Sequence, residues 1–170
     1  MNIPAASWLN PKIELRESPN KGKGMFAAES IKSGEKILIW GGIYVAKAEA
    51  EKAKVAGKFV MQWDEDLYSI EDSRGSDDTY FINHSCEPNA WMDDMFTIVT
   101  QRDIAPGEEI TVDYAVFEID PTYIAKWECR CGSSHCRKKI TGKDWMIPEL
   151  QVKYKGHFLP IINQWISELR

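Results

Sequence analysis

The sequence contains few cysteines and no long hydrophobic run. Its 170 residues include four cysteines and three histidines. No apolar stretch approaches the roughly 18 consecutive residues that a membrane-spanning helix needs. The start, Met1-Asn2-Ile3-Pro4, lacks the basic head and apolar run of a signal peptide. We therefore expect a protein that is neither membrane-bound nor secreted. Its expected location is the cytoplasm, or the nucleus if its source is eukaryotic.

Internal repeats, low-complexity segments and long linkers are also missing. The hydrophobic share of 44% and the charged share of 28% are those of an ordinary globular protein, which excludes collagen-like and wholly disordered chains. A chain of this length can bury a core without disulfide bonds. The composition therefore predicts a single domain.

The net charge of −5 is unevenly distributed. Residues 126–170 contain nine basic and four acidic residues, a net of +5, which leaves −10 for residues 1–125. Acidic residues are densest between Asp64 and Asp78, where Arg74 is the only basic residue. This acidic run is either a solvated loop surface or a rim that attracts a basic partner. Binding to duplex nucleic acid is disfavoured, because the net charge of the chain is negative and no basic stripe is present.

Short strands dominate the first half of the expected secondary structure. Alternation and turn residues predict strands at 13–16, 25–27, 36–40, 96–101 and 110–114, and a hairpin over 59–70. Residues 46–55 are rich in helix formers, and two further helices are expected, one from Pro148 and one over 159–169. No strand–helix–strand alternation occurs, so a Rossmann-type fold is disfavoured.

A glycine-rich segment, Lys21-Gly22-Lys23-Gly24, lies within an expected turn over 18–24. It lacks the spacing of a phosphate-binding loop, and no helix follows it. By itself it indicates a hairpin turn in which glycine tolerates positive φ.

The cysteines divide into one isolated residue and one cluster. Cys86 is alone, whereas Cys129, Cys131 and Cys136 form a C-x-C-x4-C pattern. In a chain without an export signal, clustered thiols indicate metal ligands more often than disulfides. A structural zinc site has four ligands, and adding Cys86 would complete that number.

A polar island interrupts apolar sequence at residues 83–89, Asn-His-Ser-Cys-Glu-Pro-Asn. Asn83 and His84 together offer donors and acceptors for an orienting hydrogen-bond network. The segment Gly-Glu-Glu-Ile-Thr-Val-Asp-Tyr follows at 107–114, and the cysteine cluster begins at residue 129.

Together these segments resemble the SET-domain protein-lysine methyltransferases. Residues 21–26 resemble the family's G-x-G segment, and residues 81–89 are similar to F-x-N-H-S-C-x-P-N. Residues 107–114 resemble G-E-E-L-T-x-D-Y, and residues 129–137 resemble the post-SET motif C-x-C-G-x-x-x-C-R. The resemblance covers roughly residues 13–140, in the family's motif order.

The resemblance implies a mainly β fold, of the β-clip or SET type, in which small curved sheets surround a pseudoknot. A helical C-terminal extension would follow. The implied organisation is a SET domain over 13–125, a post-SET zinc-binding segment over 126–140 and a helical extension over 141–170 that packs on the domain. A face for homodimerisation is the alternative role of that extension, so the chain is expected to be a monomer or a homodimer.

The resemblance also implies S-adenosylmethionine as the methyl donor. The residues implied to contact the donor are Lys23, Gly24, Met25, Tyr80, Asn83, His84, Tyr114 and Trp127. Tyr114 would be the catalytic residue at the methyl-transfer channel, where its hydroxyl orients the substrate amine without adding a charge. Trp127 lines the donor pocket or merely packs; the sequence leaves both open.

By the same resemblance, Cys86 joins Cys129, Cys131 and Cys136 around one structural zinc ion per chain. Four thiolates leave no open coordination position for catalysis. His135 is then surplus to the zinc site, and we expect it to be exposed to solvent.

Three positions depart from the family pattern. Tyr80 occupies a position where many members have arginine, which alters one donor contact. Trp40 stands where an aromatic residue usually lines the channel, unless Tyr44 supplies that ring. Val112 replaces a Phe or Tyr linked to the number of methyl groups added, so the degree of methylation cannot be deduced.

The sequence therefore predicts a methyltransferase that acts on a lysine of a basic protein or peptide. The alternative is a non-catalytic SET-like module that binds a partner through the same groove. A zinc-ribbon protein that binds nucleic acid is rejected on charge and on the position of Cys86.

Overall fold

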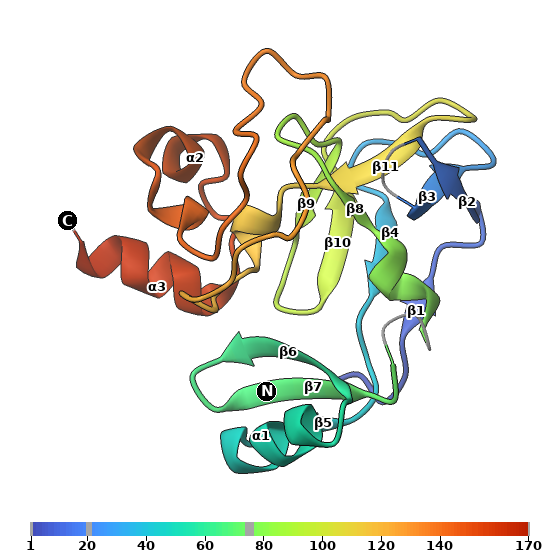
Figure 1. The fold of residues 1–170 in the computed structure, drawn as a ribbon. Coiled ribbons are helices and arrows are strands. Elements are labelled where there is room, and N and C mark those ends of the chain that lie inside the picture. The colour runs from blue at the N-terminus through green and yellow to red at the C-terminus, as the bar shows by residue number, and fades with distance from the viewer. Residues whose placement is uncertain (1, 20–21, 74–76, 170) are drawn as a thin grey trace.

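Two β-sheets and a group of C-terminal helices make up the chain in the computed structural model, which describes residues 2–19, 22–73 and 77–169. The larger sheet has eight strands and the smaller one three. Figure 1 shows the smaller sheet set apart from the larger one, with the C-terminal helices beside both. This arrangement agrees with the mainly β class and the helical C-terminal part predicted from the sequence.

The described strands are short, and each has two to six residues. Their bounds are β1 Trp8–Leu9, β2 Ile13–Ser18, β3 Gly22–Ala27, β4 Lys36–Ile39, β5 Tyr44–Val45, β6 Phe59–Asp64, β7 Leu67–Glu71, β8 Asn83–His84, β9 Ala90–Met92, β10 Thr97–Thr100 and β11 Glu109–Val112.

Strands distant in sequence are adjacent in the larger sheet, whose order is β1-β4-β10-β9-β11-β3-β2. β8 also pairs with β11, in parallel, with Asn83 opposite Thr111 and His84 opposite Val112. β3 pairs antiparallel with the first residues of β11, with Phe26 opposite Glu109 and Met25 opposite Ile110. The glycine-rich strand, the Asn83-His84 strand and the strand that precedes Tyr114 therefore meet in one place.

The smaller sheet carries the predicted hairpin and helix. β6 and β7 pair antiparallel, and β5 pairs with β7. α1, Lys47–Val55, packs on this hairpin. Ala46 at its start has no side chain to cap the helix, and Asp66 of the hairpin turn instead accepts a hydrogen bond from the Lys47 N–H at 2.8 Å.

The helical part at the C-terminus packs on the larger sheet. Its elements are η3 Asp144–Met146, α2 Pro148–Lys153 and α3 Pro160–Glu168. Both α-helices begin with proline, whose missing N–H is no loss in a first turn. Tyr154, Leu159 and Ile162 are fully buried in the same core as the strands, and the Leu159 N–H bonds to the Val116 carbonyl at 2.8 Å.

Two predicted boundaries are wrong. The expected turn over 18–24 is shorter, because Gly22, Lys23 and Gly24 already pair with β2; Lys21 lies outside the described residues. The expected strand over 110–114 ends at Val112, because the Asp113 side chain accepts a hydrogen bond from the Ala115 N–H and begins the short 3-10 helix η2, Tyr114–Val116. A second 3-10 helix, η1 over Asp78–Phe81, precedes β8.

No helix among the described residues is both long and apolar enough to cross a membrane.

Candidate active site

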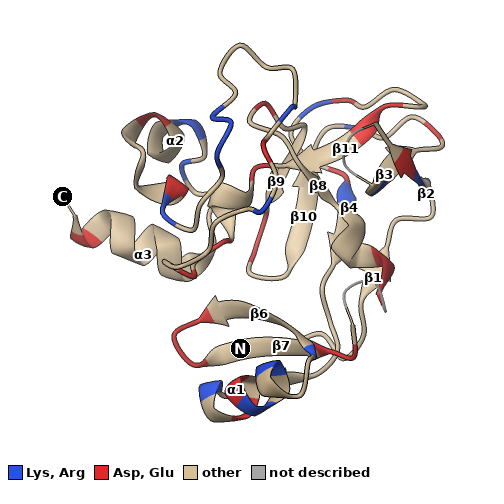
Figure 2. Cartoon of the chain, in the orientation of Figure 1, with Lys and Arg blue, Asp and Glu red and all other residues tan. Residues whose placement is uncertain are grey.

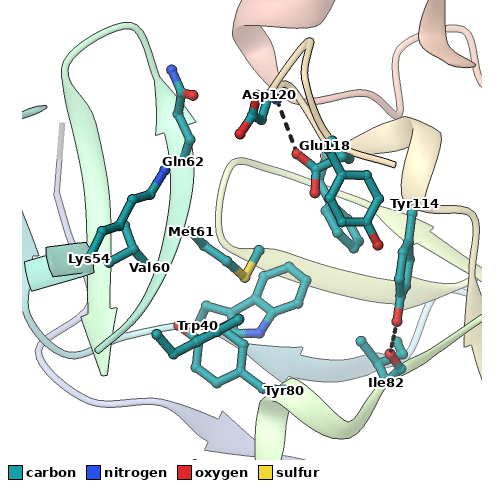
Figure 3. Close-up of a pocket in the computed structure, with 13 residues that line it drawn as sticks. Trp40, Lys54, Val60, Met61, Gln62, Tyr80, Ile82, Tyr114, Glu118 and Asp120 are labelled. Carbon is teal, nitrogen blue, oxygen red and sulfur yellow. Dashed lines mark hydrogen bonds between the residues drawn. The ribbon is translucent and has the colours of Figure 1, made fainter. Parts of the chain in front are cut away.

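Two cavities lie on either side of Tyr114. The first, here called the Asn83 cavity, has a volume of about 360 Å³ and is lined by Lys23, Phe81, Asn83, His84 and Trp127, among others. The second, the Trp40 cavity, has a volume of about 190 Å³ and is lined by Trp40, Phe59, Met61, Phe117 and Glu118, among others (Figure 3). Tyr80 and Tyr114 line both cavities and so form part of a common wall.

Asn83 connects the glycine-rich strand to β11. Its side-chain amide donates to the Lys23 carbonyl at 3.2 Å and to Glu109 Oε1 at 2.9 Å. Gly24 makes this approach possible, because a Cβ at that position would lie 2.6 Å from the Asn83 amide nitrogen and 2.8 Å from the Glu109 carboxylate. A side chain at residue 24 would displace the Asn83 amide and the Glu109 carboxylate, so Gly24 preserves this arrangement.

His84 is buried between Tyr114 and the cysteine cluster. Its Nδ1 atom accepts a hydrogen bond from the Tyr114 N–H at 3.2 Å, so in the neutral ring the proton is on Nε2. Nε2 lies 3.3 Å from Cys86 Sγ and can donate to that sulfur. The imidazole thereby links the backbone of Tyr114 to a candidate metal ligand.

Tyr114 has a fixed hydroxyl orientation. Its Oη donates to the Ile82 carbonyl at 3.0 Å, so the hydroxyl proton is committed and the oxygen acts as an acceptor toward a ligand. The ring is packed against His84 and Phe117, with centroids 5.2 and 5.3 Å away.

Trp127 lies at the edge of the Asn83 cavity. Its side chain contacts the rings of His84 and Tyr114 and is 43% exposed. Trp127 therefore lines this cavity, which is one of the two roles that the sequence left open. On the opposite side, the Lys23 ammonium lies 4.4 Å from the centre of the Phe81 ring.

The four cysteines converge, and their sulfurs all lie within 4.8 Å of one another. None forms a disulfide. Tetrahedral Zn–S bonds of about 2.3 Å place thiolate sulfurs about 3.8 Å apart, and Cys86 Sγ lies 4.0 Å from Cys129 Sγ. The donor set therefore fits one zinc ion. His135 is outside the cluster and its side chain is 82% exposed, as expected.

A buried ion pair joins the cysteine segment to the Tyr114 segment. Arg137 donates to both carboxylate oxygens of Asp113, at 2.6 and 2.7 Å, and its Nε donates to Asp144 at 3.0 Å. The Tyr154 hydroxyl donates to the same Asp113 carboxylate at 3.1 Å. Asp113 is fully buried, so this bidentate pair compensates its charge. It also holds the residue before Tyr114 in place.

The Trp40 cavity combines aromatic walls with the half-buried carboxyl groups of Glu118 and Asp120. Burial is the main cause that raises the pKa of Glu118 to about 7; the hydrogen bond from the Asp120 N–H lowers it and the Asp120 charge raises it. Burial likewise raises the pKa of Tyr80, to about 12. Tyr44, the alternative to Trp40, does not line the cavity, and its hydroxyl donates to the Trp40 carbonyl at 3.3 Å.

None of the described acidic residues from 64 to 78 lines either cavity. Its residues divide between the turn of the β6–β7 hairpin and the opposite end of that hairpin (Figure 2). Several have structural roles: Asp66 caps α1, Asp72 pairs with Lys58 at 3.1 Å, and Asp77 caps η1. The acidic groups at the Trp40 cavity are instead Glu118 and Asp120, which the sequence did not single out.

Most of the sequence-predicted site residues come together. Lys23, Tyr80, Asn83, His84, Tyr114 and Trp127 line the Asn83 cavity. Gly24 lies beside it, whereas the Met25 side chain is fully buried in the core. The sequence missed Phe81 and the Arg137–Asp113 pair, although each belongs to a motif already quoted. It also missed Glu118, for which no motif offered a signal.

Comparison with known proteins agrees with this geometry. A family model described as the SET domain matches residues 22–115, more than half of the chain. The chain belongs to the SET domain family.

Individual relatives of this SET domain are distant. The chain is 28% identical to the "Variant-silencing SET domain-containing protein" of Plasmodium falciparum, over 95% of its own length and 7% of that protein. It is 25% identical to "Histone-lysine N-methyltransferase SUV39H1" of Xenopus laevis, over 74% and 39% of the two chains. It is 30% identical to "Histone-lysine N-methyltransferase 2B" of Homo sapiens, over 74% of its own length and 5% of that protein. The chain thus spans well under half the length of these relatives.

Proposed function

We propose that this chain is an S-adenosylmethionine-dependent methyltransferase that transfers a methyl group to a lysine side chain of a protein. The observation that carries the proposal is the wall of Tyr80 and Tyr114 common to two cavities. A reaction between two bound molecules needs two adjoining sites, so that the reacting atoms meet in line.

The Asn83 cavity is the proposed site of S-adenosylmethionine. Its volume is within the range of cofactor pockets, and it offers an amide, an imidazole edge and aromatic faces. The proposed contacts are the backbone of Lys23, Gly24 and Met25, together with Tyr80, Asn83, His84, Tyr114 and Trp127. When bound, this cofactor supplies an electrophilic methyl group on a sulfonium sulfur.

The Trp40 cavity is the proposed channel for the substrate lysine. Aromatic walls desolvate the amine and so lower the lysine pKa from its usual value near 10.4. Tyr114 is the proposed catalytic residue, because its oxygen acts as an acceptor that orients the amine. Trp40 occupies the place of the aromatic residue that usually lines this channel.

The cysteine cluster is proposed to hold one structural Zn²⁺. With Cys86, Cys129, Cys131 and Cys136 as ligands, the metal fixes the segment that carries Trp127 over the Asn83 cavity. The proposed organisation remains a SET domain over 13–125, a post-SET segment over 126–140 and a helical extension over 141–170.

The proposed substrate is a basic protein in the cytoplasm or nucleus. Support comes from the relatives, two of which are named histone-lysine N-methyltransferases, and from the acidic groups Glu118 and Asp120 at the Trp40 cavity.

Two measurements test the proposal. Titration calorimetry of the full chain with S-adenosylmethionine is expected to show saturable binding. Incubation with tritium-labelled donor and a basic protein extract is expected to label discrete bands, which mass spectrometry assigns to lysine. Donor binding without any labelled protein would favour the non-catalytic module, and the absence of heat at high micromolar donor would contradict the proposed cofactor site.

A further inference from the structure

Glu118 places a carboxyl group beside the aromatic wall of the Trp40 cavity, which Asp120 and Lys54 also line. Tyr80, Tyr114 and Phe117 supply aromatic surface there, and Glu118 follows them on the chain segment after η2. In Figure 3 the Glu118 carboxyl group lies on the same side of the cavity as the Tyr114 ring, facing the hairpin residues across the opening. Aromatic surface beside carboxylate groups is suited to an organic cation.

Glu118 is held in a fixed position relative to Tyr114. Its backbone N–H donates to the Tyr114 carbonyl at 2.8 Å. Its carboxylate accepts a hydrogen bond from the Asp120 N–H at 3.0 Å, which leaves further lone pairs on the two oxygens. These hydrogen bonds hold Glu118 beside Tyr114 at the wall of the cavity.

The surroundings of Glu118 prepare it to exchange a proton near neutral pH. Its pKa is raised to about 7, mainly by burial; the charge of Asp120 acts in the same direction, whereas the hydrogen bond from the Asp120 N–H and the charge of Lys54 on α1 lower the pKa. The other titratable side chains around the cavity are Tyr80, Tyr114 and Tyr123. Tyr80 has a pKa raised to about 12 by burial, so it stays protonated in the neutral range.

A second observation concerns Trp40 on the opposite wall. Its indole Nε1–H is buried and has no hydrogen-bond partner among the described residues. The side chain is 1% exposed and lines the same cavity. An unpartnered buried donor favours a ligand atom with a lone pair. A neutral amine or a water molecule has one, whereas an ammonium group does not.

Resting on the proposed function, we propose that Glu118 accepts the proton that the substrate lysine must lose before methyl transfer, and that Trp40 favours the resulting neutral amine. The N–H bond of the ammonium breaks and its electron pair stays on the lysine nitrogen. The proton forms an O–H bond on Glu118 and later leaves to solvent. The single lone pair of the amine then leaves the Trp40 N–H and forms the new C–N bond.

Carbon-detected NMR of the full chain tests the site without turnover. The Glu118 carboxyl is expected to titrate near neutral pH, with its resonance assigned by comparison with Glu118→Gln. Adding n-butylamine, which carries the end group of lysine, is expected to lower that pKa by about one pH unit, because a cation stabilises the carboxylate. Neutral n-butanol is the matched control and should leave it unchanged. An ordinary acidic titration, or equal effects of amine and alcohol, would overturn the inference.

The second arm of the test measures kinetics with a protein substrate identified by the labelling experiment described above. Glu118→Gln is expected to lower kcat/KM about 100-fold at pH 7 and to move the rising limb of the pH profile upward, toward the pKa of free lysine. Glu29→Gln, at an exposed site outside both cavities, is the charge-matched control. Calorimetry with S-adenosylmethionine verifies that the variant is folded.

The outcomes separate the two proposals. If the wild-type chain methylates protein and the Glu118→Gln profile superimposes on it, the inference is wrong and the proposed function stands. If the wild-type chain binds neither donor nor substrate, the proposed function fails, and this role of Glu118 fails with it.

Discussion

Tyr114 occupies a position in which its hydroxyl has a defined direction. The proton is donated to the Ile82 carbonyl, and the His84 ring accepts from the backbone of the same residue. This pair of bonds fixes both ends of the tyrosine. The sequence motif identified the residue, whereas the direction of its hydroxyl follows from β8 and β11 being side by side.

Replacing Tyr114 by phenylalanine tests its proposed role. Tyr114→Phe should bind S-adenosylmethionine within about twofold of wild type but lose at least about 100-fold in turnover, because the acceptor that orients the amine is gone. Binding is measured by calorimetry and turnover with the labelled donor. Tyr44→Phe is a matched control, since Tyr44 lines neither cavity. Unchanged turnover in Tyr114→Phe would refute the role.

At the scale of elements, the cysteine segment forms a wall of the site without belonging to a strand or helix. It is held at two points, the convergent thiols and the Arg137–Asp113 pair. Asp113 is the residue before Tyr114, so the anchoring of this segment and the placement of the tyrosine depend on each other. Regular secondary structure does not contribute, which is why the segment needs these two anchors.

Elemental analysis is expected to find one zinc ion per chain in protein purified without chelator. Cys129→Ser should lower this stoichiometry and weaken donor binding at least about tenfold, because the segment that carries Trp127 is no longer fixed. His135→Ala, in the same segment but outside the thiol cluster, should keep the zinc stoichiometry and the donor affinity at wild-type values. Zinc-free wild-type protein that binds the donor normally would show that the metal site is not needed.

At the scale of the whole molecule, the C-terminal helices belong to the core that supports the site. Ile162 is fully buried, and Tyr154 reaches Asp113 through its hydroxyl. The apolar periodicity of this part left two roles open, packing or dimerisation. In the structure, Tyr154, Leu159 and Ile162 of this part lie in the main hydrophobic core.

The stability of the chain should therefore depend on the packing of the C-terminal helices in the main hydrophobic core. Ile162→Ala removes buried methyl groups and should lower the free energy of unfolding by about 2–5 kcal/mol, measured by urea denaturation. Val152→Ala, at a side chain 75% exposed on α2, should change it by less than about 0.5 kcal/mol. Sedimentation should give the same oligomeric state for both variants. A dissociated oligomer with unchanged unfolding in Ile162→Ala would instead indicate a dimer face.

Local sequence was sufficient for many elements, because their signals lie within a few residues. The hairpin over 59–70, the helix over 46–55 and the proline-started helices follow from alternation, propensity and capping. The end of β11 at Val112 did not follow from local sequence, because the Asp113 side chain accepts a hydrogen bond from the Ala115 N–H and so ends the strand. The start of β3 at Gly22 depends on pairing with β2, a tertiary preference stronger than the turn propensity of glycine.

The sequence by itself indicated the family, the mainly β class, the four thiols and the residues Asn83, His84 and Tyr114, because the motifs that carry the resemblance are short and local. Only the tertiary structure decided that Tyr80 and Tyr114 form the wall of two cavities and that Glu118 lies beside Tyr114 in an aromatic cavity. The same holds for the burial of the Trp40 N–H without a partner among the described residues. Burial and proximity depend on strands far apart in sequence, so no local pattern encodes them.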